Sequence, residues 1–229
     1  MSLREQKPWV QAAVGLLDVR RRDRILAFEV DVDATRQLAT LAGKDGEVLA
    51  VVGDPQQAEQ LADLGLPQLR VLAHELVGNE CFGSFDAMLV LATTGPLLPI
   101  GAYPDLARQN LRPGGRLVID VPGLSSIPDL ATAWSQLGWD AERLQPLMGV
   151  ADDVLADALR HAGLRNVHAV LGAHLLHAIT PGELVATFAD ALQLTGDEPL
   201  QLTHALVRQK GGTDPTEALA HRTRVTGLR

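Results

Sequence analysis

Short apolar runs bounded by turn residues recur along the first half of the chain. Between them lie segments in which apolar residues recur every three or four positions, as on one face of a helix. The expected strands are residues 25–28, 47–52, 70–73, 84–91 and 116–121. Runs that are apolar throughout and alternate with helices are typical of parallel strands buried on both faces. The pattern therefore predicts an α/β fold with right-handed crossovers and helices on both faces of the sheet.

Helix caps and stops support this assignment. We expect a helix that is capped by Asp33 or Thr35, reaches about Leu41 and ends before Gly43. Thr180 and Glu183 have the spacing of a capping box. The other expected helices are residues 5–19, 56–64, 105–110, 130–136, 151–162 and 181–192. Two further strands, 166–171 and an antiparallel last strand at 201–208, bring the predicted sheet to seven strands.

Composition fits one globular domain with a full core. Hydrophobic residues make up 46% and charged residues 21% of the 229 residues, so the chain is not expected to be disordered. Within a single domain spanning 1–229, we expect an N-terminal helix in 1–22, a lid-like insertion at 124–150 and a mobile tail at 211–229. No apolar run approaches the roughly 18–20 residues that span a bilayer. The polar N-terminus then favours a cytoplasmic protein.

Charge and ligand-forming residues exclude several functions. The formal net charge of −8 argues against nucleic acid as a partner, although three arginines follow His221 near the end of the chain. Cys81 is the single cysteine, which excludes an intrachain disulfide. His168 and His174 would share one face of a strand and His177 the other, so no metal site is expected.

Three motifs resemble those of a known family. Leu111–Ile119 (LRPGGRLVI) is similar to the LxPGGxLxI turn before the fifth strand of class I S-adenosylmethionine-dependent methyltransferases, in the manner of the type 11 group. Gly83–Met88 resembles the entry to their fourth strand, and Ala162–Val167 resembles the lead into their sixth. The resemblance extends over residues 23–210. It implies a Rossmann-like sheet and S-adenosylmethionine as cofactor.

The cofactor loop departs from the family pattern. The family has an acid followed by three alternate glycines, which let the backbone approach the methionyl end of the cofactor. Here Ala27 falls at the acid and Glu29, Asp31 and Asp33 at the glycines; a slide by two residues restores Glu29 as the acid. Like charges about 4 Å apart repel by roughly 4 kcal/mol at an effective dielectric of 20, an upper-end figure for an open site. The cofactor's carboxylate would meet that repulsion.

The resemblance also implies the other cofactor contacts. Asp54, with Pro55, falls where the family binds the ribose hydroxyls, and an Asp-Pro turn is the alternative interpretation. His74 falls at the position that contacts the adenine amine, and Glu75 could take that role instead. The candidate cofactor-binding residues are therefore Glu29, Asp31, Asp54, Pro55, His74 and Glu75.

Two functions from different classes follow from these residues. One is a methyltransferase acting on a small soluble acceptor; no catalytic residue or general base is assigned. The other is a non-catalytic protein that has kept the fold, lost cofactor binding through its degenerate loop, and serves as a binding module. The expected partner is a small-molecule acceptor, with no nucleic acid and no membrane, and we allow for a homodimer.

Overall fold

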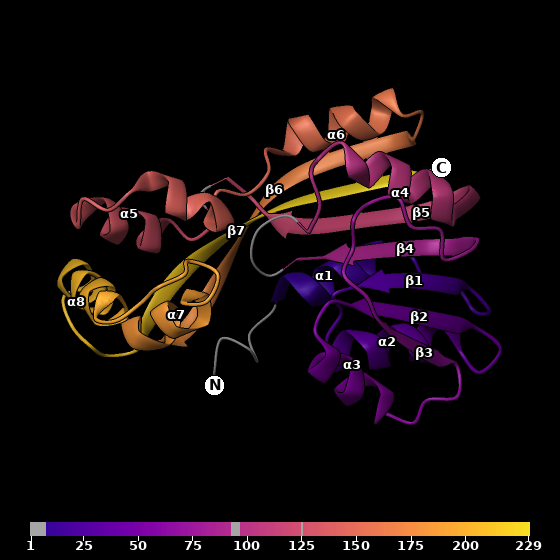
Figure 1. Ribbon diagram of the computed structural model, residues 1–229. Helices are drawn as coiled ribbons and strands as arrows, with labels where there is room; N and C mark the ends of the chain where they lie inside the picture. The colour runs from indigo at the N-terminus through magenta and orange to yellow at the C-terminus, as the bar shows by residue number, and fades with distance from the viewer. Residues whose placement is uncertain (1–7, 93–96, 125) are drawn as a thin grey trace.

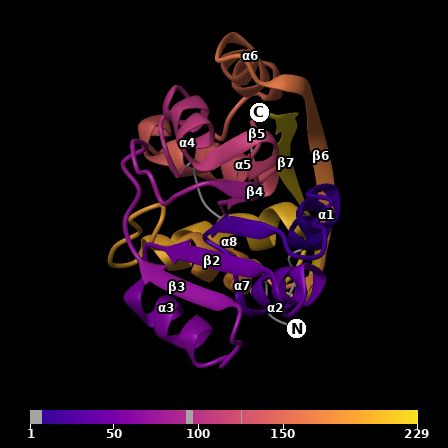
Figure 2. The ribbon, with the colours of Figure 1, turned by 90° about the vertical axis from the view of Figure 1, so that its right-hand side faces the viewer.

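A computed structural model describes residues 8–92, 97–124 and 126–229. Its strands form one seven-stranded sheet in the order β3-β2-β1-β4-β5-β7-β6, running from β3 low in Figure 2 to β6 at the right. Neighbours from β3 to β5 pair in parallel, and β7 lies antiparallel between β5 and β6. Helices cover both faces (Figure 1). The predicted fold class is confirmed.

The strands that coincide with expected runs are β1 (Arg24–Phe28), β2 (Glu47–Val52), β3 (Leu69–Ala73), β4 (Phe85–Leu91), β5 (Leu111–Pro122) and β6 (Arg165–Ile179). A seventh strand, β7 (Thr216–Leu228), lies outside every expected run. The helices are α1 (Pro8–Leu16), α2 (Val32–Ala42), α3 (Pro55–Ala62), α4 (Ala102–Asn110), α5 (Pro128–Gln136), the 3₁₀ helix η1 (Ala141–Leu147), α6 (Asp152–His161), α7 (Pro181–Phe188) and α8 (Glu198–Lys210). The predicted capping box of α7 is confirmed, because Thr180 and Glu183 each accept from the other's backbone.

The sheet separates two hydrophobic cores because successive side chains of each strand point to opposite faces. Ile25 and Ala27 of β1 pack in the core that contains α1 and α2, whereas Leu26 and Phe28 pack in the core of α4 and α6. The central strands β1 and β4 are buried on both faces except at Arg24, as their mainly apolar sequences predicted.

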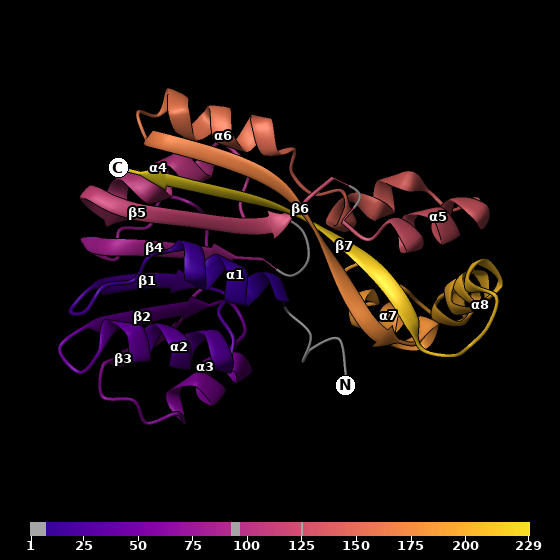
Figure 3. The same ribbon diagram turned by 180° about the vertical axis from the view of Figure 1, so that it is seen from behind.

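The second half of β6 and the first half of β7 extend beyond the main sheet as a two-stranded ribbon (Figure 3). Helices α5, α7 and α8 gather around this ribbon and pack on one another. Their core is continuous with the core of α1 and α2. We call α5, η1, α7, α8 and the ribbon the helical lobe.

Two expectations for the C-terminal part are wrong. Residues 201–208 are not a strand but part of α8, in which Leu202, Ala205 and Leu206 share the buried face. The helical spacing of those three residues explains the difference. The last strand is β7, which lies in the segment expected to be a mobile tail. Asp120 of β5 pairs with Arg222, which is buried, and with Arg224, which is half-buried.

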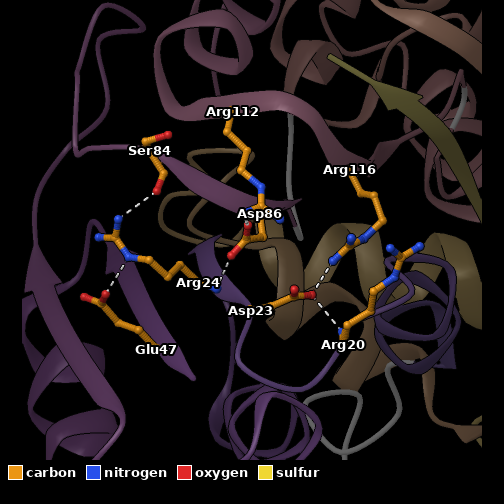
Figure 4. Close-up of polar contacts among 8 residues, drawn as sticks. All are labelled: Arg20, Asp23, Arg24, Glu47, Ser84, Asp86, Arg112 and Arg116. Atoms are coloured by element: carbon orange, nitrogen blue, oxygen red, sulfur yellow. Dashed lines mark hydrogen bonds and ion pairs between the residues drawn. The ribbon is translucent and has the colours of Figure 1, made fainter. Parts of the chain in front are cut away.

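The amino ends of the strands are held together by ion pairs (Figure 4). Asp23 pairs with Arg116 across the sheet. Asp86 accepts the Arg24 backbone N–H at 2.7 Å and also pairs with Arg112. Because these side chains are tied to one another at strand starts, we assign them a structural role. The candidate site lies at the opposite end of these strands, where their carboxyl ends meet.

Candidate functional site

The carboxyl end of β1 is the point at which the strand order reverses, since β2 lies on one side of β1 and β4 on the other. In open α/β sheets, ligands bind in the crevice outside the carboxyl ends of strands at such a point. Glu29 and Asp31 follow β1 there, and Asp54 follows β2. These candidate residues therefore lie at the carboxyl ends of the strands, where ligands bind in folds of this kind.

Glu29 joins the ends of β1 and β2. Its backbone has φ of 53°, in the left-handed region that favours glycine. Its Oε1 accepts the backbone N–H of Gly53 at 2.7 Å, and its own N–H donates to Val51 O at 3.0 Å. Burial raises the pKa of Glu29, the Gly53 bond lowers it, and the charge of Asp54 raises it further; the net shift is upward. The side chain thus spans the space between the two strand ends.

Asp31 closes the N-terminus of α2. Its Oδ1 accepts the Ala34 backbone N–H at 2.9 Å, and its backbone oxygen accepts the Thr35 hydroxyl at 2.7 Å. The expectation that Asp33 or Thr35 caps this helix is wrong, because α2 begins earlier and Asp33 lies exposed in its first turn. The N-terminus of α2, which could otherwise bind an anionic ligand, is therefore already occupied by the Asp31 carboxylate.

Asp54 and Pro55 form the start of α3. The Asp54 Oδ1 accepts the Gln56 backbone N–H at 2.9 Å, and Pro55 occupies the first turn. The Asp-Pro turn that the sequence left as an alternative is therefore present. A carboxylate that caps a helix can still accept from ligand hydroxyls, because each oxygen has more than one lone pair.

His74 continues β3, with its N–H donating to Val52 O at 2.9 Å, while Glu75 beside it is exposed. The Nε2 of His74 lies 3.4 Å from Glu80 Oε1, and its ring meets Phe82 edge-on at 5.8 Å between centroids. Burial acts to raise the pKa of Glu80, but bonds from backbone N–H groups, including Gly78, and from His74 lower it overall.

Two of these residues escaped the sequence analysis. Glu80 and Phe82 lie in the long segment between β3 and β4, where no periodicity marks them. The structure brings Phe82 against His74 and also against Phe28, with ring centroids 5.9 Å apart in the second pair. Phe82 thus adds an aromatic surface beside the ends of β1 and β3.

S-adenosylmethionine fits the residues present only in part. Asp54, His74 and Phe82 offer an acceptor for hydroxyls, a hydrogen-bonding ring and an apolar wall, which suit an adenosine group. The Glu29 carboxylate has the charge that suits the cofactor's ammonium group. The carboxylate does not fit, because the Gly53 N–H is taken by Glu29 and the N-terminus of α2 by Asp31.

Comparison with known proteins agrees with this architecture. No protein-family model and no curated protein matches the chain. Among solved structures, YcgJ of Bacillus subtilis superposes with a TM-score of 0.64 at 11% identity, covering 96% of this chain and 97% of that chain. The chain therefore shares a Rossmann-like fold with YcgJ and with solved methyltransferase structures.

Two further structures with this fold differ in the reaction that their descriptions name. A cyclopropane synthase, MmaA2 of Mycobacterium tuberculosis, matches with a TM-score of 0.55 at 13% identity, covering 100% of this chain and 88% of that one. A SAM-dependent O-methyltransferase of Thermotoga maritima matches with a TM-score of 0.52 at 14% identity, covering 99% and 68%. The fold is therefore compatible with more than one reaction. No helix among residues 8–92, 97–124 and 126–229 is long and apolar enough to cross a bilayer.

Proposed function

We propose that this chain is an S-adenosylmethionine-dependent methyltransferase that acts on a small soluble acceptor in the cytoplasm. The observation that supports it most is the class I sheet order with Asp54 at the carboxyl end of β2, beside the point where the strand order reverses. When bound, the cofactor would supply the methyl group. Asp54 would accept from the ribose hydroxyls, His74 or Glu75 would contact the adenine amine, and Glu29 would accept from the ammonium group.

The segment proposed as a lid supports a small acceptor. It leaves the sheet after β5 and returns to the same place, where the Val150 N–H donates to Pro122 O at 2.9 Å and Val150 bridges to Gly123. Helix α5 and η1 therefore lie in a segment that leaves and rejoins the sheet at the carboxyl end of β5, the same end of the parallel strands at which the candidate site lies. A lid formed by residues 124–150 would exclude water from the site and position an acceptor there.

A specific observation favours the second candidate, a non-catalytic binding protein. Glu29 and Asp31 both use their carboxylates to satisfy backbone N–H groups of this chain. The backbone N–H groups of Gly53 and Ala34 are thereby occupied, so a ligand carboxylate could bind them only after the internal bond is broken. In this reading the loop stabilises the fold and leaves no room for the cofactor's charged end.

Calorimetric titration with S-adenosylmethionine, S-adenosylhomocysteine and adenosine separates the two. Binding of the first two ligands in the micromolar range supports the methyltransferase, and Glu29→Gln should then weaken it by about tenfold, since one charge-assisted bond is lost. Absence of heat at millimolar concentrations of both would reject it in favour of the non-catalytic protein. Binding of adenosine alone would identify a different adenosine ligand.

A further inference from the structure

The two edges of the sheet differ in how they are protected from pairing with other strands. At one edge, β3 has only five residues, and the side chain of Arg70 in it is 74% exposed. Short, charged edge strands resist pairing. At the other edge, β6 has fifteen residues and a described strand neighbour, β7, on one side only.

No charged side chain interrupts the β6 edge. Residues 166–182 contain no Asp, Glu, Lys or Arg, although such residues make up 21% of the chain. Helix α6 reaches the beginning of the strand, where Arg160 donates to Val167 O at 3.0 Å. From His168 to Leu176 the pairing with β7 has no bulge, so the backbone pairing in this segment is regular.

Apolar side chains flank this edge. Leu171 and Leu175 lie on one face of β6 because they are four positions apart in the regular segment, and they are 49% and 38% exposed. Leu219 of β7 pairs directly with Leu175 and is 42% exposed. On the opposite face Val170 is 60% exposed. Contiguous exposed apolar groups of this kind mark interaction surfaces.

We propose that β6 pairs with the β6 strand of a second copy of this chain, antiparallel about a twofold axis at Ala173. Such an axis places Leu171 opposite Leu175 of the partner subunit, and does so twice because the interface is self-complementary. The two sheets then continue into one another across the axis, and the unpaired backbone groups of both edges are satisfied.

The distribution of charge favours a second copy of this chain as the partner that binds the β6 edge. Each chain carries a formal charge of −8, so contact between two copies meets least repulsion at a segment without acidic residues, and residues 166–182, which contain most of β6, are such a segment. The ends of the strand are also complementary. Arg165 begins β6, whereas Glu183 and Glu217 lie near its end. Antiparallel pairing brings the basic end of one strand toward the acidic end of the other.

Light scattering on the full-length chain tests the association. Wild type should have twice the mass of one chain, and Leu171→Lys/Leu175→Lys should be monomeric, with a dissociation constant raised at least about a hundredfold because both leucine–leucine contacts, and so four buried leucines, are lost. Leu200→Lys is the matched control, since Leu200 is 56% exposed on α8, and it should remain dimeric. Circular dichroism verifies that both variants are folded.

A cysteine placed on the axis tests the geometry. In a Cys81→Ser background, Ala173→Cys should form a disulfide-linked dimer on mild oxidation, because paired residues on neighbouring strands lie within disulfide range. Val154→Cys, on the exposed surface of α6, should not. A monomeric wild type overturns the proposal, as does a dimer that survives both lysines or fails to cross-link at residue 173. Binding of a different protein by a monomeric chain also overturns it.

Discussion

Asp31 illustrates how one side chain decides between binding a ligand and stabilising a helix. Its carboxylate lies at the N-terminus of α2, where the family resemblance implies a glycine. We expect Asp31→Gly to raise the affinity for S-adenosylmethionine by tenfold or more and to leave adenosine affinity unchanged, because adenosine has no carboxylate to repel. The helix should lose only a few tenths of a kcal/mol, since glycine is a tolerated N-cap.

Calorimetry of both ligands measures this effect, and Asp33→Gly provides the control. Asp33 is acidic and lies two residues away, but it is exposed in the first turn and is not the cap. Equal gains from both substitutions would show that general reduction of negative charge is responsible. No gain from Asp31→Gly would show that this carboxylate is not the obstacle to binding.

Asp120 is the residue on which the attachment of β7 depends. It is fully buried, and its two oxygens accept from Arg222 Nε and Arg224 Nε at 2.7 Å each. Asp120→Asn should lower the free energy of unfolding by about 3–5 kcal/mol, because it leaves two guanidinium groups without their counter-charge inside the protein. Urea denaturation measures the change. Asp129→Asn, which removes a surface pair with Lys210, should cost at most about 1 kcal/mol.

At the scale of single elements, Arg143 connects η1 to α8. Its Nη1 and Nη2 donate to the two oxygens of Glu198 at 2.8 and 3.0 Å, and its guanidinium lies over the Trp134 ring. The Arg143 bonds are the main cause that lowers the pKa of Glu198 from 4.5 to about 2. In Arg143→Met the Glu198 pKa should return toward 4.5, as measured by NMR titration.

The pH dependence of stability follows from the same shift. Because the pKa of Glu198 is lower in the folded chain, its stabilising contribution is present above pH 4.5 and is lost as pH falls toward 2. Stability of Arg143→Met should depend less on pH in that range than stability of wild type. An unchanged profile would mean that Arg143 is not the cause, and Arg160→Met, at an exposed pair on α6, is the control.

The elements also show where sequence patterns suffice. Strands β1, β2 and β4 were predicted because each is a short, mainly apolar run bounded by turn residues. The start of β6 was also predicted, although the strand continues to Ile179. Strand β7 was missed because Arg222 and Thr223 look solvated in sequence. Their burial depends on partners elsewhere, Asp120 and Val150, which no local pattern reveals.

For the candidate site, the sequence again predicted position better than detail. Its location at the carboxyl ends of the strands and the unusual acids after β1 follow from strand order and spacing. What sequence could not determine is how each acid is used. Whether Asp54 caps α3 or faces a ligand depends on side-chain direction, and the pairing of His74 with Glu80 depends on the path of the segment between β3 and β4.

At the scale of the whole molecule, the question is whether the helical lobe and the sheet are one folding unit. A single core contains Ala13 and Leu38 on the sheet side and Leu130, Leu184 and Leu206 in the lobe. Strands β6 and β7 also run continuously through both parts. We therefore predict one cooperative unfolding transition, since neither part can be exposed without opening the shared core.

Tryptophan fluorescence can report on each part separately. Trp9 lies on α1, whereas Trp134 and Trp139 pack edge-on in the helical lobe with ring centroids 4.7 Å apart. In Trp9→Phe the remaining tryptophan fluorescence comes from the helical lobe. The midpoint of urea unfolding followed by this fluorescence should coincide with the midpoint followed by far-ultraviolet circular dichroism, which reports on the secondary structure of the whole chain. An earlier fluorescence transition would mean that the lobe opens independently, and 124–150 could then move as a lid without unfolding the sheet.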